Sequence, residues 1–146
     1  MIKSFKLFDS KDNSKFEDDS YEIRQIFLSL FEEYDYIIPL GDTDNYQNYI
    51  TYEFESGKEN YNNKGYFFNI KIYVSYNMLD KFESLIPKFK QLMKVLSDYN
   101  YYPHILNTYQ KKKRFGTELE DYLFHIKSYY ASSYLAATPL TILTSI

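Results

Sequence analysis

The chain has 146 residues, 45% of them hydrophobic and 25% charged, a length and composition typical of one globular domain over residues 1–146 with its own core. It contains no cysteine, which excludes disulfides, thiolate metal sites and cysteine nucleophiles. Residues 1–13 alternate charged and apolar residues and show no apolar signal-peptide core, so we expect a cytoplasmic protein.

Aromatic residues are unusually abundant, with 18 Tyr, 12 Phe and no Trp. Together with the frequent Asn, Lys and Ile, this composition favours an AT-rich source such as a low-GC bacterium or its phage. Charge is also uneven. Residues 1–59 hold 14 acids and 6 bases, a net −8, whereas residues 60–146 hold 6 acids and 11 bases, a net +5, which together give −3. The asymmetry indicates either a dipolar surface or two halves that interleave in space and neutralise each other.

A strand followed at once by a helix is the clearest pattern in the chain. Alternate residues of the segment 66–76 are apolar, which predicts a strand with one buried and one polar face. Asn77 is expected to cap a helix whose apolar stripe runs to residue 96. Pro87 lies inside that stripe, so the helix either kinks there or divides in two.

The remaining segments predict shorter elements. Residues 1–8 predict a short strand or a loose arm and residues 9–19 an acidic loop, so residues 1–19 as a whole are a possible loose arm. Asp19 with Glu22 predicts the start of a helix that ends near residue 33. Further elements are expected at residues 34–40 (strand), 49–55 (strand), 101–109 (strand), 117–137 (helix) and 140–146 (strand).

These elements predict an α+β fold: a three- to four-stranded, mainly antiparallel sheet with two to three helices packed on one face, in the order α-β-β-β-α-β-α. Pro103 places the strand at 101–109 at an edge of the sheet or near a strand end. The only histidines, His104 and His125, have no nucleophile or acid at a catalytic spacing, so we expect no catalytic site, no metal and no cofactor.

The order helix, three strands, helix, strand is similar to the core of the PD-(D/E)xK nucleases. That resemblance implies a metal held by acids on the second and third strands, with a lysine beside them. Here Glu53 and Glu55 lie on the polar face of one strand, and Asn69 and Lys71 on the polar face of the next. No Pro-Asp opens the second strand, and Asn69 stands where the family has an acid. The alternative is a solvated sheet face with a cross-strand Glu–Lys pair.

A run of four cations suggests a second kind of site. Lys111, Lys112, Lys113 and Arg114 are flanked by Tyr109 and Phe115. Adjacent cations attract phosphate backbones and aromatic rings stack on bases, so the run predicts binding of nucleic acid or another polyanion. The alternative is an exposed, solubilising loop.

The last 19 residues carry no charged side chain and are broken by Pro139, which argues against a membrane span. They predict either a buried C-terminal helix and strand or, over residues 138–146, a tail that docks on a partner or on a second copy. The partner contacts would then be Tyr134, Leu140, Ile142 and Ile146.

The leading hypothesis is therefore a non-catalytic protein-interaction or structural protein. A phage or low-GC accessory protein fits this reading, either as a virion component or as a small inhibitor of a host system, which would place it in a virion or the host cytoplasm. Surface tyrosines favour it because they bury area at small entropic cost. The alternatives are a nucleic-acid-binding module using the run 111–114 and a metal-dependent, nuclease-like domain with a degenerate site.

Overall fold

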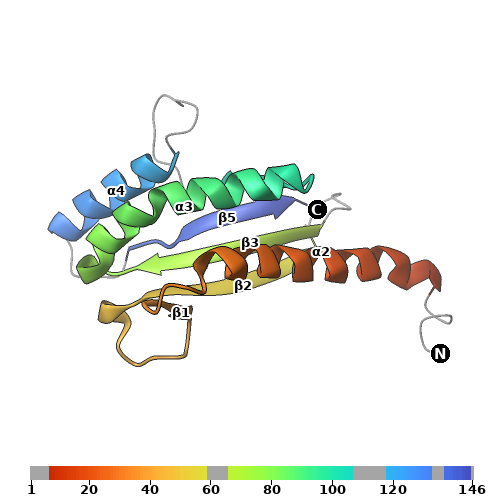
Figure 1. Ribbon diagram of the computed structural model, residues 1–146, viewed down its shortest axis with the longest axis horizontal. Helices are drawn as coiled ribbons and strands as arrows, with labels where there is room; N and C mark the ends of the chain where they lie inside the picture. Colours follow the sequence, from red (N-terminus) through yellow and green to blue (C-terminus); the bar gives the residue numbers. More distant parts are fainter. Residues whose placement is uncertain (1–6, 59–65, 107–117, 133–136, 146) are drawn as a thin grey trace.

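The protein is described here from a computed structural model that places residues 7–58, 66–106, 118–132 and 137–145. Within these residues it has an α+β fold with a five-stranded mixed sheet and three helices, which confirms the predicted class and adds one strand to the predicted three to four (Figure 1). The strands, in chain order, are β1 (Ile37–Pro39), β2 (Ile50–Lys58), β3 (Tyr66–Val74), β4 (Tyr102–Ile105) and β5 (Leu140–Ser145).

The order of strands across the sheet is β1-β2-β3-β5-β4. β1 and β2 are parallel, whereas every other neighbouring pair is antiparallel. The antiparallel pairs β3–β5 and β5–β4 leave β3 and β4 parallel to each other, one strand apart. The C-terminal strand β5 fills that gap, so the sheet is complete only when the end of the chain has joined it.

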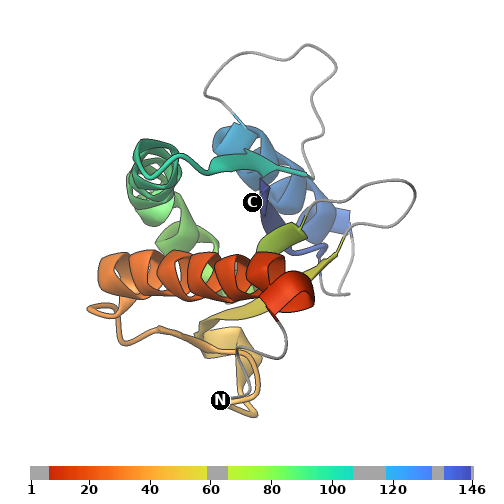
Figure 2. The same ribbon diagram turned by 90° about the vertical axis from the view of Figure 1, so that its right-hand side faces the viewer.

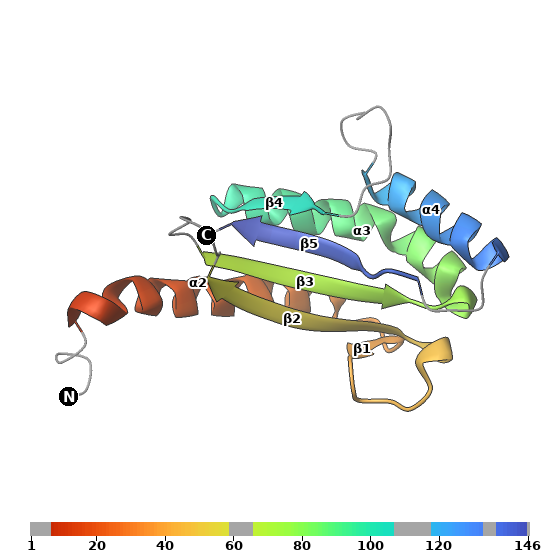
Figure 3. The same cartoon turned by 180° about the vertical axis from the view of Figure 1, so that it is seen from behind.

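The three helices lie on one side of the sheet. They are α2 (Leu7–Phe31), α3 (Leu79–Asp98) and α4 (Glu118–Ser132). In Figure 1, α2 crosses in front of β2 and β3, and α3 runs beside it with α4 outside α3. Seen from behind, the strands stand in front of the helices (Figure 3). No described helix covers that second face, which we call the open face.

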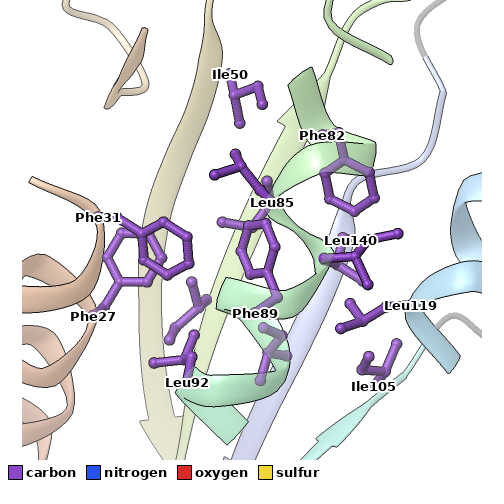
Figure 4. Close-up of a cluster of buried hydrophobic side chains, with 14 of the residues drawn as sticks. Phe27, Phe31, Ile50, Phe82, Leu85, Phe89, Leu92, Ile105, Leu119 and Leu140 are labelled. Carbon is purple, nitrogen blue, oxygen red and sulfur yellow. The ribbon is translucent and has the colours of Figure 1, made fainter. Parts of the chain in front are cut away.

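Apolar side chains from the sheet and all three helices form a single core. Phe27 and Phe31 of α2, Phe89 of α3 and Leu119 of α4 converge on the covered face (Figure 4). The predicted alternation holds on both central strands: Phe68, Ile70, Ile72 and Val74 are buried, and Tyr52 and Phe54 contact Phe27. Burial of this stripe supplies the main stabilisation of the fold.

The helix α2 begins earlier than the sequence predicts. Residues 9–19 are helical rather than a loop, and Asp19 lies inside the helix instead of capping it. A polar helical segment has no apolar periodicity to reveal it, and pairs four residues apart, such as Lys15 with Asp19 at 2.9 Å, support it. The part of the predicted arm before residue 7 lies outside the described residues.

The helix α3 runs through Pro87 without a break, so of the two alternatives that the sequence leaves open, a kinked helix or two helices, the second is wrong. The Asn77 cap is also wrong, because a 3-10 turn, η2 (Tyr76–Met78), separates β3 from the helix. That turn ends the strand at Val74 and turns Tyr76 outward, leaving its side chain 66% exposed rather than buried as predicted.

Each of the two edge strands of the sheet contains a proline. β4 is an edge strand that contains Pro103, as predicted, and the opposite edge strand, β1, has three residues and ends at Pro39. Proline has no N–H to donate to an added strand, and short edge strands offer little to pair with. Strand addition at either edge is therefore disfavoured, and a partner is better accommodated by side chains.

Candidate interaction surfaces and the polar sheet face

The predicted docking tail is part of the core where the structure describes it. Leu140 and Ile142 are fully buried, and β5 pairs with β3 on one side and β4 on the other. This corrects the docking prediction for those two residues, because a partner reaches them only if the central strand leaves the sheet. Tyr134 and Ile146 lie outside the described residues, as does the basic run 111–114.

The four residues of the nuclease-like pattern lie together on the open face: Glu53, Glu55, Asn69 and Lys71. In the register, Glu53 lies opposite Lys71 and Glu55 opposite Asn69. The lysine pairs diagonally, with its Nζ 2.9 Å from Oε2 of Glu55, while Nδ2 of Asn69 donates to Oε1 of the same carboxylate at 3.4 Å. The alternative prediction, a cross-strand Glu–Lys pair, is confirmed.

The second carboxylate on this face has a partner of its own. The hydroxyl of Tyr73 donates to Oε1 of Glu53 at 2.6 Å. Burial, together with this bond to a carboxylate, raises the pKa of Tyr73 to about 12. The hydrogen bond from Lys71 lowers the pKa of Glu55, against the opposing effect of desolvation. These shifts favour the neutral phenol of Tyr73 and the ionised carboxylate of Glu55, and each group is held by its neighbour.

No group of three His, Cys, Asp or Glu side chains that could hold a metal occurs among the residues the structure places. His104 is exposed on β4 and His125 is half-buried on α4. The side-chain oxygen of Asn69 is buried without a partner, but it has no exposed surface that a ligand could reach.

Exposed aromatic residues gather at the end of the molecule where β3 ends, α3 begins and α4 ends. A groove of about 1220 Å³ opens there between η1 (Tyr46–Asn48), η2 and the last turns of α4. We call it the tyrosine groove, and its principal walls are Leu40, Tyr46, Tyr76 and Tyr130. Leu40, Tyr46 and Tyr76 are exposed, which is costly for large apolar side chains that meet at one place.

The walls of the tyrosine groove are held in position. The Oγ of Ser75 donates to the backbone oxygen of Gln47 at 3.0 Å, which ties η2 to η1 and so fixes Tyr76 relative to Tyr46. The hydroxyl of Tyr130 donates to the backbone oxygen of Val74 at 2.7 Å, and its ring meets that of Tyr76 edge-on at 6.1 Å. Rigid aromatic anchors of this kind lose little entropy when a partner binds.

A second polar cluster links α2 to the turn between α3 and β4, at the end of the molecule that faces the viewer in Figure 2. The buried hydroxyl of Tyr101 lies 2.6 Å from Glu22 and 2.9 Å from Asp19. Desolvation and these two carboxylates raise the pKa of Tyr101 well above its usual value. Asp19 also accepts from Lys15, so the cluster is internally satisfied and serves to hold α2 in place.

Sequence reasoning missed the tyrosine groove. Tyr76 continues the alternating pattern of residues 66–76, which predicts a buried side chain, and Tyr46 lies in the polar segment 42–48, which predicts a loop. The one available signal was the Ser75-Tyr76-Asn77 stretch, whose polar residues are typical of a turn. Even so, it is the antiparallel pairing of β2 with β3, in which Ile50 lies opposite Val74, that brings η1 beside η2.

Comparison of the chain with protein-family models, with curated proteins and with solved structures finds no match. Within the described ranges, no helix has both the length and the apolar character needed to cross a membrane.

Proposed function

We propose that this protein is a non-catalytic interaction protein that binds a protein partner in the tyrosine groove. The observation that carries the proposal is the pairing of Tyr46 and Tyr76, which are 46% and 66% exposed and stand on two turns joined by a hydrogen bond. Exposed tyrosines on rigid supports are the usual anchors of protein interfaces.

The shape of the site supports a macromolecular partner. Its volume of about 1220 Å³ exceeds the roughly 300–1,000 Å³ of most small-molecule sites, and it is a wide groove with several exposed side chains. The polar cluster on the open face supports the same interpretation, because Glu53 is held by Tyr73, and Lys71, the lysine of the nuclease-like pattern, is paired with Glu55.

Site-specific photocrosslinking tests the proposal. A photoreactive phenylalanine analogue at position 76 is expected to capture a distinct protein, or a second copy of this chain, in cells that make the protein. The matched control carries the analogue at position 21, because Tyr21 is 65% exposed on α2, away from the tyrosine groove. Capture that is equal at the two positions, or absent at position 76, contradicts the proposal.

A further inference from the structure

One exposed apolar side chain lies on the helix that supplies part of the wall of the tyrosine groove. Phe124 on α4 is 75% exposed, the highest fraction among the large apolar side chains for which the structure gives an exposure. Unlike tyrosine, it has no hydroxyl to offer water. Its place in the helix puts it on the outward stripe with Ala131, seven residues and therefore about 10 Å further along α4.

Ala131 is part of the wall of the tyrosine groove. A protruding ring and a hollow thus lie next to each other on one face of one helix. In an interface with two-fold symmetry, each copy uses the same patch, so a protrusion on one copy must meet a hollow on the other, and the reverse. Because this patch carries both the protruding Phe124 ring and the groove, two copies of it are complementary in shape.

Two ion pairs flank the ring on α4 and are compatible with a second copy. On the groove side of Phe124, Nζ of Lys127 is 2.6 Å from Oε1 of Glu83, and one turn before Phe124, on the other side, Lys90 pairs with Glu120. All four side chains are about half exposed, and the two pairs are neutral. An identical surface can therefore approach without net repulsion from these groups, and across a two-fold axis each cation can also meet the other copy's anion.

We propose that the occupant of the tyrosine groove is a second copy of this chain, with Phe124 of each copy inserted into the groove of the other. The two α4 helices then lie antiparallel across the two-fold axis. This inference rests on the proposed function and names its partner. Burial of two exposed phenylalanines and of the tyrosines that receive them supplies the driving force.

Sedimentation equilibrium of the purified full chain is the first test. The wild type is expected to have twice the chain mass of 17.6 kDa at micromolar concentration. Phe124→Ser and Tyr76→Ser are each expected to weaken dimerisation by about 30-fold or more, the effect of losing an interface hot spot. Tyr21→Ser, an equally exposed site on α2, is expected to remain a dimer. Circular dichroism and urea unfolding identify any variant that fails to fold.

Mixing the two monomeric variants gives the sharper test. Phe124→Ser keeps an intact groove and Tyr76→Ser keeps an intact ring, so a mixed pair regains one of the two insertions. An equimolar mixture is therefore expected to associate more tightly than either variant alone. A general loss of surface hydrophobicity predicts no such recovery.

The outcomes separate this inference from the proposed function. A wild type that stays monomeric up to about 100 μM, well above the range of specific association, overturns the second copy as occupant, while a foreign protein captured at position 76 still supports the function. A dimer lost in Tyr76→Ser but kept in Phe124→Ser retains the groove as the interface and overturns Phe124 as its occupant. A mixture that fails to recover association also overturns the insertion.

Discussion

On β3, Ile70 and Lys71 are neighbours in sequence and lie on opposite faces of the sheet. Ile70 is fully buried under the helices, whereas the side chain of Lys71 remains 25% exposed and pairs with Glu55. One face is stabilised by apolar burial beneath a close-packed layer, and the other by polar side chains that satisfy one another across the strands. The two faces of β3 are therefore stabilised by different interactions, and substitutions on them are expected to change the free energy of unfolding by different amounts.

The largest expected difference comes from truncating these two neighbours. Ile70→Ala leaves a cavity against α2 and α3 and is expected to lower the free energy of unfolding by about 2–5 kcal/mol. Lys71→Ala removes an exposed ion pair and is expected to cost less than about 1 kcal/mol. Urea unfolding of both variants measures the contrast. Equal losses would show that the open face is as tightly packed as the covered one.

A buried hydroxyl on the covered face predicts a gain in stability. Thr144 is fully buried, and its Oγ1 has no hydrogen-bond partner. Thr144→Val keeps the shape and removes the unpaired polar atom, so the free energy of unfolding is expected to rise by about 1 kcal/mol. Thr144→Ser is the matched control, because it keeps the hydroxyl and loses a methyl group. If Thr144→Val is the less stable of the two, the hydroxyl has a partner in solution.

The sequence predicts the division between the two faces because alternation is a local property of each strand. Alternation predicts that Phe68, Ile70 and Ile72 lie in the core, as they do, and it predicts Glu53, Glu55 and Lys71 on the polar face. The place of β5 is different. Its pairing with β3, such as Ile142 with Ile70, joins segments about seventy residues apart, and no local pattern distinguishes a central strand from a docking tail.

The helical turns and the groove were harder to predict for the same reason. The polar start of α2 carries no apolar period, and Tyr76 obeys the strand alternation until η2 interrupts it. The antiparallel register of β2 with β3 pairs Ile50 with Val74 and so sets η1 beside η2, which no single segment shows by itself. The surface that we propose for a partner is thus assembled by tertiary contacts and leaves little trace in the sequence.

Alkaline titration probes a polar pair on the open face. The folded pKa of Tyr73, about 12, lies above the usual value near 10, so the fold favours the neutral phenol. The stabilisation is complete below pH 10 and is lost as the pH rises through about 12. The stability advantage of the wild type over Tyr73→Phe is therefore expected to shrink across that range. In Glu53→Gln, ultraviolet titration should show a lower pKa for Tyr73, and an unchanged value would contradict the contact.

The smallest expected effect is at the exposed end of the same face. Lys71 holds the pKa of Glu55 below its ordinary value of 4.5, so the stabilisation from this carboxylate is present above that pH and is lost as the pH falls through the lower, folded value. Lys71→Met removes the cation and leaves the opposing desolvation, so the pKa of Glu55 is expected to rise. Carboxyl carbon NMR shifts followed between pH 2 and 7 report it directly. Lys88→Met is the matched control, because Lys88 pairs with Glu33, 3.4 Å away, and belongs to a different ion pair. If the pKa of Glu55 is the same in wild type and Lys71→Met, the diagonal ion pair does not persist in solution, and the open face is held by Tyr73 and Glu53 without it.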